Sequence, residues 1–376
     1  VGPGDGASPL ALAAADLDRD GRLDFVASGP VGASLYRQVA PGRFRVEGLF
    51  DRARTTSVTV LDADADGALD LVFAGVDGLR LLLGDGAGGF RPAGPAMGSL
   101  ARRRDGEPEA RSVGRGDLDG DGFPEVVSTH PRGDATTCHA RDAESRYRDV
   151  ARLSGLAAAS RDASGQGVAI FDADNDGDLD IFVASGALRE PASRRPRAAA
   201  ERRLVYERSL FYLNDGGGHF REVGDDFGEA MAAARNVLAA LAADLDRDGR
   251  LDLLLDRADG PPLVLWNRLR PRPWIRVRLE ADPASSSPPE GIGARVEVEA
   301  GGRRQHRWVR RSRGHTSGPA TVHFGLGDAA EVDVLWIRWP SGQVDRHGGV
   351  TAGRDYVARE GGALEPDPGS SPSKRG

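Results

Sequence analysis

The sequence predicts an all-β protein: a β-propeller of at least five blades, followed by a small β-rich domain. Three observations lead to this prediction. An acidic nine-residue motif occurs five times, with starts 46 to 72 residues apart. Short apolar runs flank the copies, and a strand–turn–aromatic pattern follows most of them. One acidic loop per unit of about four short strands is typical of a propeller blade.

The repeated motif is D-x-D-x-D-G-x-x-[DE], and it begins at residues 16, 62, 117, 172 and 244. These windows hold 20 of the 40 Asp residues, so much of the Asp surplus over the 17 Glu residues belongs to the motif. Carboxylates at positions 1, 3 and 5 project into a tight loop, and Gly at position 6 permits the sharp turn. The carbonyl at position 7 and the acid at position 9 complete an oxygen cage.

Such a cage suits Ca²⁺, which takes six to eight oxygen ligands, better than Mg²⁺, which prefers a tight octahedron with retained waters. We therefore expect about five Ca²⁺ ions, each neutralising carboxylates that would otherwise repel one another. The predicted metal ligands are Asp16, Asp18, Asp20, Arg22, Asp24, Asp62, Asp64, Asp66, Ala68, Asp70, Asp117, Asp119, Asp121, Phe123, Glu125, Asp172, Asp174, Asp176, Asp178, Asp180, Asp244, Asp246, Asp248, Arg250 and Asp252.

The first six positions also resemble an EF-hand loop, but that loop needs Glu at position 12 and a helix on each side. Position 12 holds Ala27, Phe73, Ser128, Val183 and Leu255. The flanking runs, such as residues 167–171 and 181–184, are short, apolar and β-prone. The unit is therefore strand–loop–strand.

A second hairpin follows most loops. Residues 35–44, 81–90 and 211–220 each read as a strand, a glycine-rich turn and a returning aromatic residue. In the third unit Cys138 and Tyr147 take the equivalent positions, which predicts that Cys138 is an interior strand residue. Each of these four units therefore supplies four strands.

At this point the residues resemble a known family. The acidic hairpins and the hairpins after them, over about residues 10–267, are similar to FG-GAP/VCBS repeats. That resemblance implies a calcium-loaded propeller of the kind that such repeats build in integrin α-chains and many bacterial surface proteins. The motif is specific for fold and metal, and it leaves the function open.

The C-terminal segments 274–279, 291–298, 323–327 and 332–342 resemble the ASPIC/UnbV domain. Repeats followed by this domain are similar to the cartilage acidic protein family and its bacterial relatives. We expect the propeller to span residues 1–267, the ASPIC/UnbV-like domain residues 268–361, and a disordered tail residues 362–376.

No catalytic motif stands out, so no catalytic or organic cofactor residue is predicted, and an enzyme is the less favoured class. The preferred function is a binding or scaffold module with structural calcium. The alternative is an enzyme or accessory protein of enediyne-type polyketide biosynthesis that uses the propeller channel, because some relatives implied by the resemblance are encoded beside such genes.

Charge and composition limit the classes of partner that the protein can have. The net charge of −7 argues against nucleic acid, and no apolar stretch approaches the roughly 18 residues of a membrane span. The Arg-rich segment 303–313 is either a solvated face or a patch for glycans or other polyanions. We expect a monomer whose ligand is a protein or a glycan or other polyanion. The chain begins at Val1, so we expect that a signal peptide was removed and that the protein is periplasmic, extracellular or on the cell surface.

Overall fold

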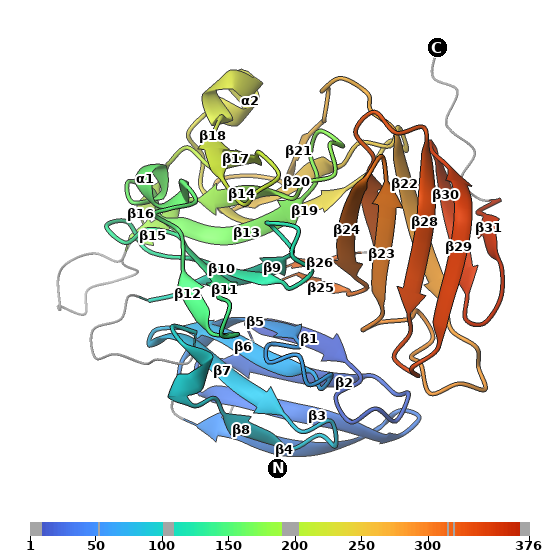
Figure 1. Cartoon of the computed structure of the whole chain (residues 1–376). Coiled ribbons are helices and arrows are strands. Elements are labelled where there is room, and N and C mark those ends of the chain that lie inside the picture. The colour runs from blue at the N-terminus through green and yellow to red at the C-terminus, as the bar shows by residue number, and fades with distance from the viewer. Residues whose placement is uncertain are drawn as a thin grey trace.

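The structure, a computed structural model, describes residues 10–51, 53–100, 109–189, 203–313, 316–318 and 320–368. These ranges are almost entirely β-structure (Figure 1). The helices that they contain are short: α1 (Leu156–Ser160), α2 (Glu229–Ala232), and the 3₁₀ turns η1 (Pro95–Met97) and η2 (Gly224–Phe227). Within the described ranges, no helix has the length and apolar character needed to cross a membrane. The predicted all-β class is confirmed.

Five antiparallel sheets follow one another along the repeats, and each contains the two strands that flank one acidic loop. The first sheet is β1 (Ala11–Ala15), β2 (Asp24–Gly29), β3 (Gly32–Ala40) and β4 (Arg43–Asp51); the second is β5 (Thr55–Leu61), β6 (Asp70–Gly75), β7 (Gly78–Gly84) and β8 (Phe90–Pro92). The third is β9 (Ser112–Gly116), β10 (Glu125–Thr129), β11 (Thr137–Arg141) and β12 (Tyr147–Asp149).

The fourth sheet is β13 (Gly165–Phe171), β14 (Asp180–Ser185), β17 (Leu210–Asn214) and β18 (Phe220–Glu222), and the fifth is β19 (Val237–Ala243), β20 (Asp252–Arg257) and β21 (Leu263–Leu265). A separate ribbon, β15 (Ala187–Arg189) with β16 (Arg203–Val205), lies in the connection from β14 to β17. The aromatic residues predicted to return after each turn, such as Tyr147, lie at or next to the start of the outer strands. Cys138 is buried in β11, as predicted.

The first strands of the sheets contact one another in chain order: β1 with β5, β5 with β9, β9 with β13, and β13 with β19. This is how propeller blades surround a central channel. A hairpin of the C-terminal domain, β25 (Ser312–Arg313) with β26 (Thr316–Ser317), joins the two ends of the series, because β25 contacts β1 and β26 contacts β19. In Figure 1 the C-terminal domain accordingly occupies the sector between the fifth and the first sheet.

Neighbouring sheets pack face to face, which explains why their strands are continuous apolar runs. Along β14, Ile181 and Val183 enter the core against the third sheet, whereas Phe182 and Ala184 enter the core against the fifth. Side chains alternate across a strand, so one run of four apolar residues supplies two cores.

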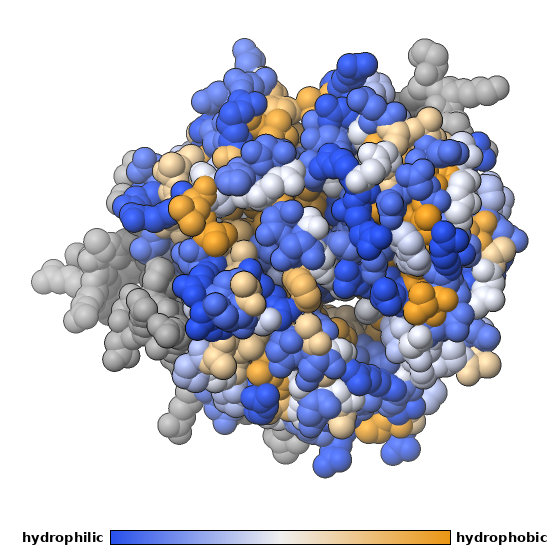
Figure 2. Space-filling view, viewed as in Figure 1, coloured by the Kyte–Doolittle hydropathy of each residue, from blue (hydrophilic) through white to orange (hydrophobic). Residues whose placement is uncertain are grey.

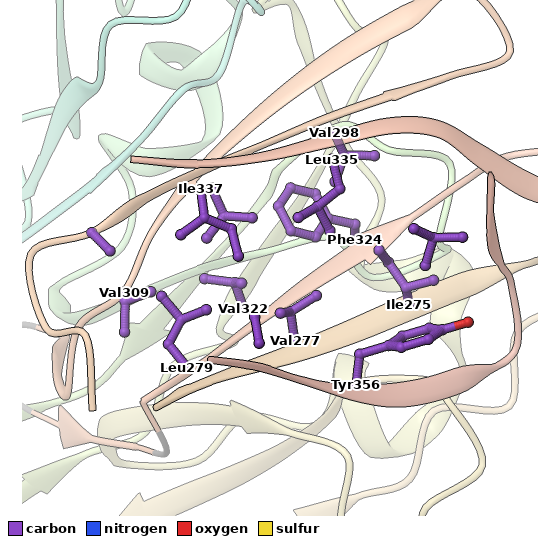
Figure 3. Packing of buried hydrophobic residues seen from close by; sticks show 14 of the residues in the cluster. Ile275, Val277, Leu279, Val298, Val309, Val322, Phe324, Leu335, Ile337 and Tyr356 are labelled. Atoms are coloured by element: carbon purple, nitrogen blue, oxygen red, sulfur yellow. The ribbon is translucent and has the colours of Figure 1, made fainter. Parts of the chain in front are cut away.

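The C-terminal domain consists of two four-stranded sheets. One is β27 (Thr321–Gly325), β22 (Trp274–Glu280), β30 (Arg354–Arg359) and β31 (Leu364–Pro366), in which β22 and β30 are parallel; the other is β24 (Arg303–Trp308), β23 (Arg295–Ala300), β28 (Glu331–Arg338) and β29 (Val344–Thr351). Val277 and Phe324 of the first sheet face Leu335 and Ile337 of the second in a common core (Figure 3).

One prediction about the tail is wrong. Residues 364–366, which we expected to be disordered, form β31 and pair with Tyr356, Val357 and Ala358 of β30. Leu364 packs against the core of the domain, so an apolar side chain and free hydrogen-bonding groups at a sheet edge together order this segment. Residues 369–376 lie outside the described residues.

Candidate metal centres and their contacts with the C-terminal domain

Each acidic loop connects the first two strands of a sheet, and its backbone turns twice through the left-handed region. Position 4 has a positive φ in every loop; for example, φ is 57° at Asn175 and 79° at Gly120. Position 6 is always Gly, and its φ lies between 82° at Gly21 and 100° at Gly177. Glycine adopts this conformation without steric cost, which accounts for its place in the motif.

The structure brings three carboxylates of each loop together, with one oxygen of each within 4.8 Å of the others. Positions 1, 3 and 9 form the group in three loops, and positions 1, 3 and 5 form it in the other two. The five groups are Asp16, Asp18 and Asp24; Asp62, Asp64 and Asp66; Asp117, Asp119 and Glu125; Asp172, Asp174 and Asp180; and Asp244, Asp246 and Asp248. All the donors are oxygens, the ligand type that hard divalent cations prefer.

The remaining predicted ligands lie outside these groups: position 7 in all five loops, position 5 in three loops and position 9 in two. At position 5, the carboxylate accepts a hydrogen bond from the N–H of position 7; Asp176, for example, accepts from Asp178 at 3.0 Å. In the first and fifth loops, Arg22 and Arg250 at position 7 also contact the position-5 carboxylates through their side chains. Sequence reasoning assigned these two residues through their carbonyls and did not foresee the ion pairs.

Position 9 has a second role that the motif did not reveal. Asp24 is fully buried; it accepts from Leu17 N at 3.1 Å and from Gln38 N, on the third strand, at 2.8 Å. The position-9 Asp residues of the second, fourth and fifth loops make the equivalent pair of bonds. This carboxylate therefore fastens the loop to the body of its own sheet.

Four loops contain a buried carboxylate oxygen that has no hydrogen-bond partner among the described residues. These oxygens are Asp18 Oδ1, Asp62 Oδ1, Glu125 Oε1 and Asp172 Oδ1. A buried polar atom without a partner is costly, so each of these oxygens is suited to a ligand that supplies positive charge. The four loops thus pass a test of fit for a metal ion.

Burial also raises the pKa values of the loop carboxyls, and repulsion between neighbours adds to the effect. The pKa of Asp70 and of Asp172 rises to about 7, and that of Asp16 to about 6. The pKa of Glu125 is raised well above its usual range. The metal-free clusters therefore retain protons near neutral pH, and a bound divalent cation would displace them.

The C-terminal domain lies directly on the loops. Arg272 Nη1 is 2.8 Å from Asp174 Oδ2, Arg303 contacts Asp178, and Arg276 Nη1 is 3.2 Å from Asp244 Oδ2. In addition, a Cβ at the position-6 glycine of four loops would meet this domain: Gly21 faces Ser286, Gly122 faces Arg295 and His306, Gly177 faces Gln305, and Gly249 faces Trp274. These glycines thus also permit the close approach of the two parts of the chain.

The segment His-Phe-Gly-Leu-Gly at residues 323–327 contacts the fourth loop. His323 Nε2 lies 2.8 Å from Asn175 Oδ1, and Gly325 N donates to Asp172 Oδ2 at 3.1 Å. A Cβ on Gly325 would overlap both Asp172 and the backbone of Asn175. Burial lowers the pKa of His323 to about 3, so its ring is neutral where it stacks on Trp274. This motif is therefore a docking element.

The Arg-rich segment 303–313 does not form one patch. Arg303 contacts the fourth loop, Arg307 donates to Gly177 O at 3.1 Å, and Arg310 donates to Arg115 O at 2.8 Å. Arg304 and Arg311 instead pair with Glu299 and Glu290 of their own domain. Neither a solvated face nor a single polyanion patch describes this segment, because three of these five side chains point at the repeats. Sequence patterns give no signal for such pairing over more than 100 residues.

Comparisons with known proteins agree with this architecture. The family model described as FG-GAP-like repeat matches residues 16–73, 62–128, 117–183 and 204–255, which together make up more than half of the chain. The model described as ASPIC and UnbV matches residues 284–365. The search of curated proteins found no match.

Three solved structures show a distant likeness. They are an Agrocybe aegerita lectin that recognises non-reducing terminal N-acetylglucosamine (16% identity, TM-score 0.34, covering 68% of this chain and 80% of that one), the V. cholerae biofilm matrix protein Bap1 (12%, 0.38, 92% and 60%) and a Bacillus licheniformis rhamnogalacturonan lyase (14%, 0.35, 94% and 73%). At these TM-scores the likeness carries no argument about function.

Proposed function

Since this chain belongs to the FG-GAP-like repeat family and carries an ASPIC/UnbV domain after the repeats, we propose that it is a calcium-binding β-propeller that serves as an extracytoplasmic binding or scaffold module. The observation that carries the proposal is the grouping of three carboxylate oxygens within 4.8 Å in each of the five loops. In this proposal residues 1–267 form the propeller, the second domain runs from residue 268 through β31 (Leu364–Pro366), and the protein is a monomer.

The role proposed for calcium is structural. Each loop gathers negative charge at the start of a blade, and four of the loops bury a carboxylate oxygen without a hydrogen-bond partner in the described part of the chain. A divalent ion would neutralise the repelling carboxylates and would also give the buried oxygen a partner. It would bind the folded loop far better than the unfolded chain. Its binding free energy therefore becomes folding free energy.

The position of the loops extends this effect to the whole molecule. Four of the five loops lie against the C-terminal domain, so ions bound there would stiffen the interface as well as the blades. Loops of this kind that bind weakly need the millimolar calcium found outside the cytoplasm, which supports an exported protein. The face in Figure 2 is mainly hydrophilic, with hydrophobic residues scattered over it, as suits a module exposed to water.

A metal count and thermal melting test the proposal. At equilibrium dialysis against millimolar calcium, the protein should hold about five calcium ions per chain in excess of the dialysate, and it should melt at a much higher temperature than the chelated protein. Magnesium at the same concentration should restore less of the melting temperature. A chelated protein that melts at the same temperature as the calcium-loaded protein would contradict the proposal.

A pair of variants ties the result to one loop. Asp172→Asn keeps the shape of the side chain but removes its charge from the fourth loop, so we expect one calcium ion fewer and a lower melting temperature. Asp215→Asn is the matched control, because the Asp215 side chain is 66% exposed and lies in a hairpin turn outside the acidic loops. The control should keep the full metal count.

A further inference from the structure

A cavity of about 130 Å³ lies between the propeller and the C-terminal domain. The strands β9, β13 and β19, which line the channel, form one side of it. The segment from β24 to the β25–β26 hairpin, together with β22 and β27, forms the other side. Four arginines line the cavity: Arg115 from the propeller, and Arg276, Arg307 and Arg310 from the C-terminal domain.

Arg115 is the unusual member of this set. It is only 5% exposed, and among the described residues no carboxylate lies within ion-pair distance of its guanidinium group. Its Nε is buried and has no hydrogen-bond partner in the described structure. The group lies over the ring of Trp308, 5.4 Å from the centroid, and a ring face is a weaker partner than a carboxylate. A buried guanidinium without a counter-ion is costly, because its charge has been removed from water.

Two of the other guanidinium groups have hydrogen-bond partners of their own. Arg307 donates to uncharged acceptors, namely the carbonyls of Gly177 and His306 at 3.1 Å and the side-chain oxygen of Gln305 at 3.3 Å. Arg276 is held by Asp355 through two bonds of 2.7 and 2.8 Å.

Two carboxylates, Asp172 and Asp244, also line the cavity, and both belong to the candidate metal groups of their loops. Asp172 Oδ2 accepts from Gly177 N at 2.9 Å and Gly325 N at 3.1 Å, whereas Asp244 accepts from two loop N–H groups and from Arg276. The lining thus holds four Arg and two Asp side chains, and Asp355 neutralises Arg276 from outside the lining.

We propose that this cavity is a binding site for a small oxyanion, a carboxylate or a tetrahedral sulfate or phosphate group, with Arg115 as the main recognition residue. The planar guanidinium fork matches the paired oxygens of such groups. A volume of about 130 Å³ is several times the roughly 30 Å³ share of one water molecule, so an oxyanion fits whereas a large ligand could place only an acidic end group inside. The inference names a ligand class for the binding module and rests on that proposed function.

The test is a thermal-melting titration of the calcium-loaded full chain with sodium sulfate and, separately, with sodium acetate, at constant ionic strength. At least one salt should raise the melting temperature of the wild-type protein with saturation in the low-millimolar range. A response to acetate alone identifies a carboxylate site, and a response to sulfate alone identifies a tetrahedral anion site. No saturable response to either salt would overturn the inference.

Variants separate specific binding from general salt effects, which sulfate also exerts. Arg115→Met should abolish the saturable shift and, without added anion, should be at least as stable as the wild type, because it removes a buried unpaired charge. Arg307→Gln should weaken the shift at least threefold in apparent affinity. The control Arg304→Gln, on the same strand but paired outside with Glu299, should leave it unchanged. An Arg115→Met protein that keeps the shift, or that no longer folds, would overturn the proposal.

The calcium and anion proposals fail in different ways. If melting responds to sulfate or acetate but chelation has no effect, the anion site stands and the calcium proposal falls. If chelation lowers the melting temperature but neither anion changes it, the calcium proposal stands and the anion site falls. Repeating the titration on chelated protein completes the comparison.

Discussion

His306 Nδ1 lies 2.7 Å from Asp117 Oδ2, which joins two residues 189 positions apart in the chain. Asp117 is the first residue of the third acidic loop, and the same oxygen accepts from Gly122 N at 3.2 Å. Both side chains are buried. A histidine of the C-terminal domain is thus part of the hydrogen bonding that shapes a candidate metal loop, so domain docking and loop geometry depend on each other.

Replacing His306 should therefore weaken the whole molecule. His306→Ala leaves the Asp117 carboxylate buried with one partner fewer, and we expect the free energy of unfolding to fall by about 1–3 kcal/mol. Urea unfolding of calcium-loaded protein measures this change. His219→Ala is the control, because the His219 side chain is 67% exposed; its effect should stay within about 0.5 kcal/mol. Equal effects of the two variants would contradict this role.

Gly325→Ala should disturb the fourth loop. Its new Cβ would overlap Asp172 and the backbone of Asn175, which cannot move cheaply, so we expect a loss of at least about 1–3 kcal/mol and weaker metal binding at that loop. Gly348→Ala, in β29, is the control: its Cβ would come no closer than 3.5 Å to Asp333 O. Denaturant unfolding and a calcium titration check both variants. A Gly325→Ala protein with wild-type stability would contradict this prediction, because it would show that the fourth loop can move to accommodate the Cβ atom without cost.

The stability of the metal-free protein should fall as pH rises. The pKa of Asp70 is raised by burial to about 7 in the folded chain, against about 3.9 in an unfolded chain. The folded state therefore binds the proton more tightly, and this stabilisation is complete below about pH 4 and lost as pH rises through 7. We expect metal-free protein to melt at a higher temperature at pH 6 than at pH 7.5.

A variant isolates this carboxyl from opposing groups. Burial lowers the pKa of His139 to about 4 and that of His323 to about 3, so these residues favour folding at higher pH. Asp70→Asn removes one carboxyl and leaves both histidines, so its melting temperature should rise less than that of the wild type when the pH is lowered. Identical pH profiles for the two proteins would refute the assignment. Calcium should flatten the wild-type profile, because a bound ion keeps the carboxylates ionised.

Truncation tests the ordered part of the tail. A chain that ends at Ala363 lacks β31 and exposes the edge of β30, together with the core residues beside Leu364, so we expect its melting temperature to fall by a few degrees. A chain that ends at Pro368 keeps β31 and is the control, with an expected melting temperature equal to that of the full chain. If the shorter chain melts at the same temperature as the control, β31 adds no stability.

Local features of the fold were predictable because they depend on residues that are near one another in sequence. The acidic loops, the strands that flank them and the returning aromatic residues follow from spacing, glycine conformation and alternating burial. The same reasoning placed Cys138 inside a strand. It missed the left-handed residue at position 4, because only Gly120 and Asn175 belong to types that favour that conformation.

By itself, the sequence determined the repeat unit, the all-β class and the carboxylates that gather in each loop. The nine-residue motif and the two-residue alternation of side chains along a strand depend only on residues that are close in sequence. Tertiary structure decided that the C-terminal domain closes the ring, that His306 and Gly325 support the acidic loops, and that Arg115 is buried without a counter-ion among the described residues. These features arise between segments that are distant in the sequence, where contact depends on how the blades curve around the channel. No local pattern of charge or hydrophobicity encodes that curvature.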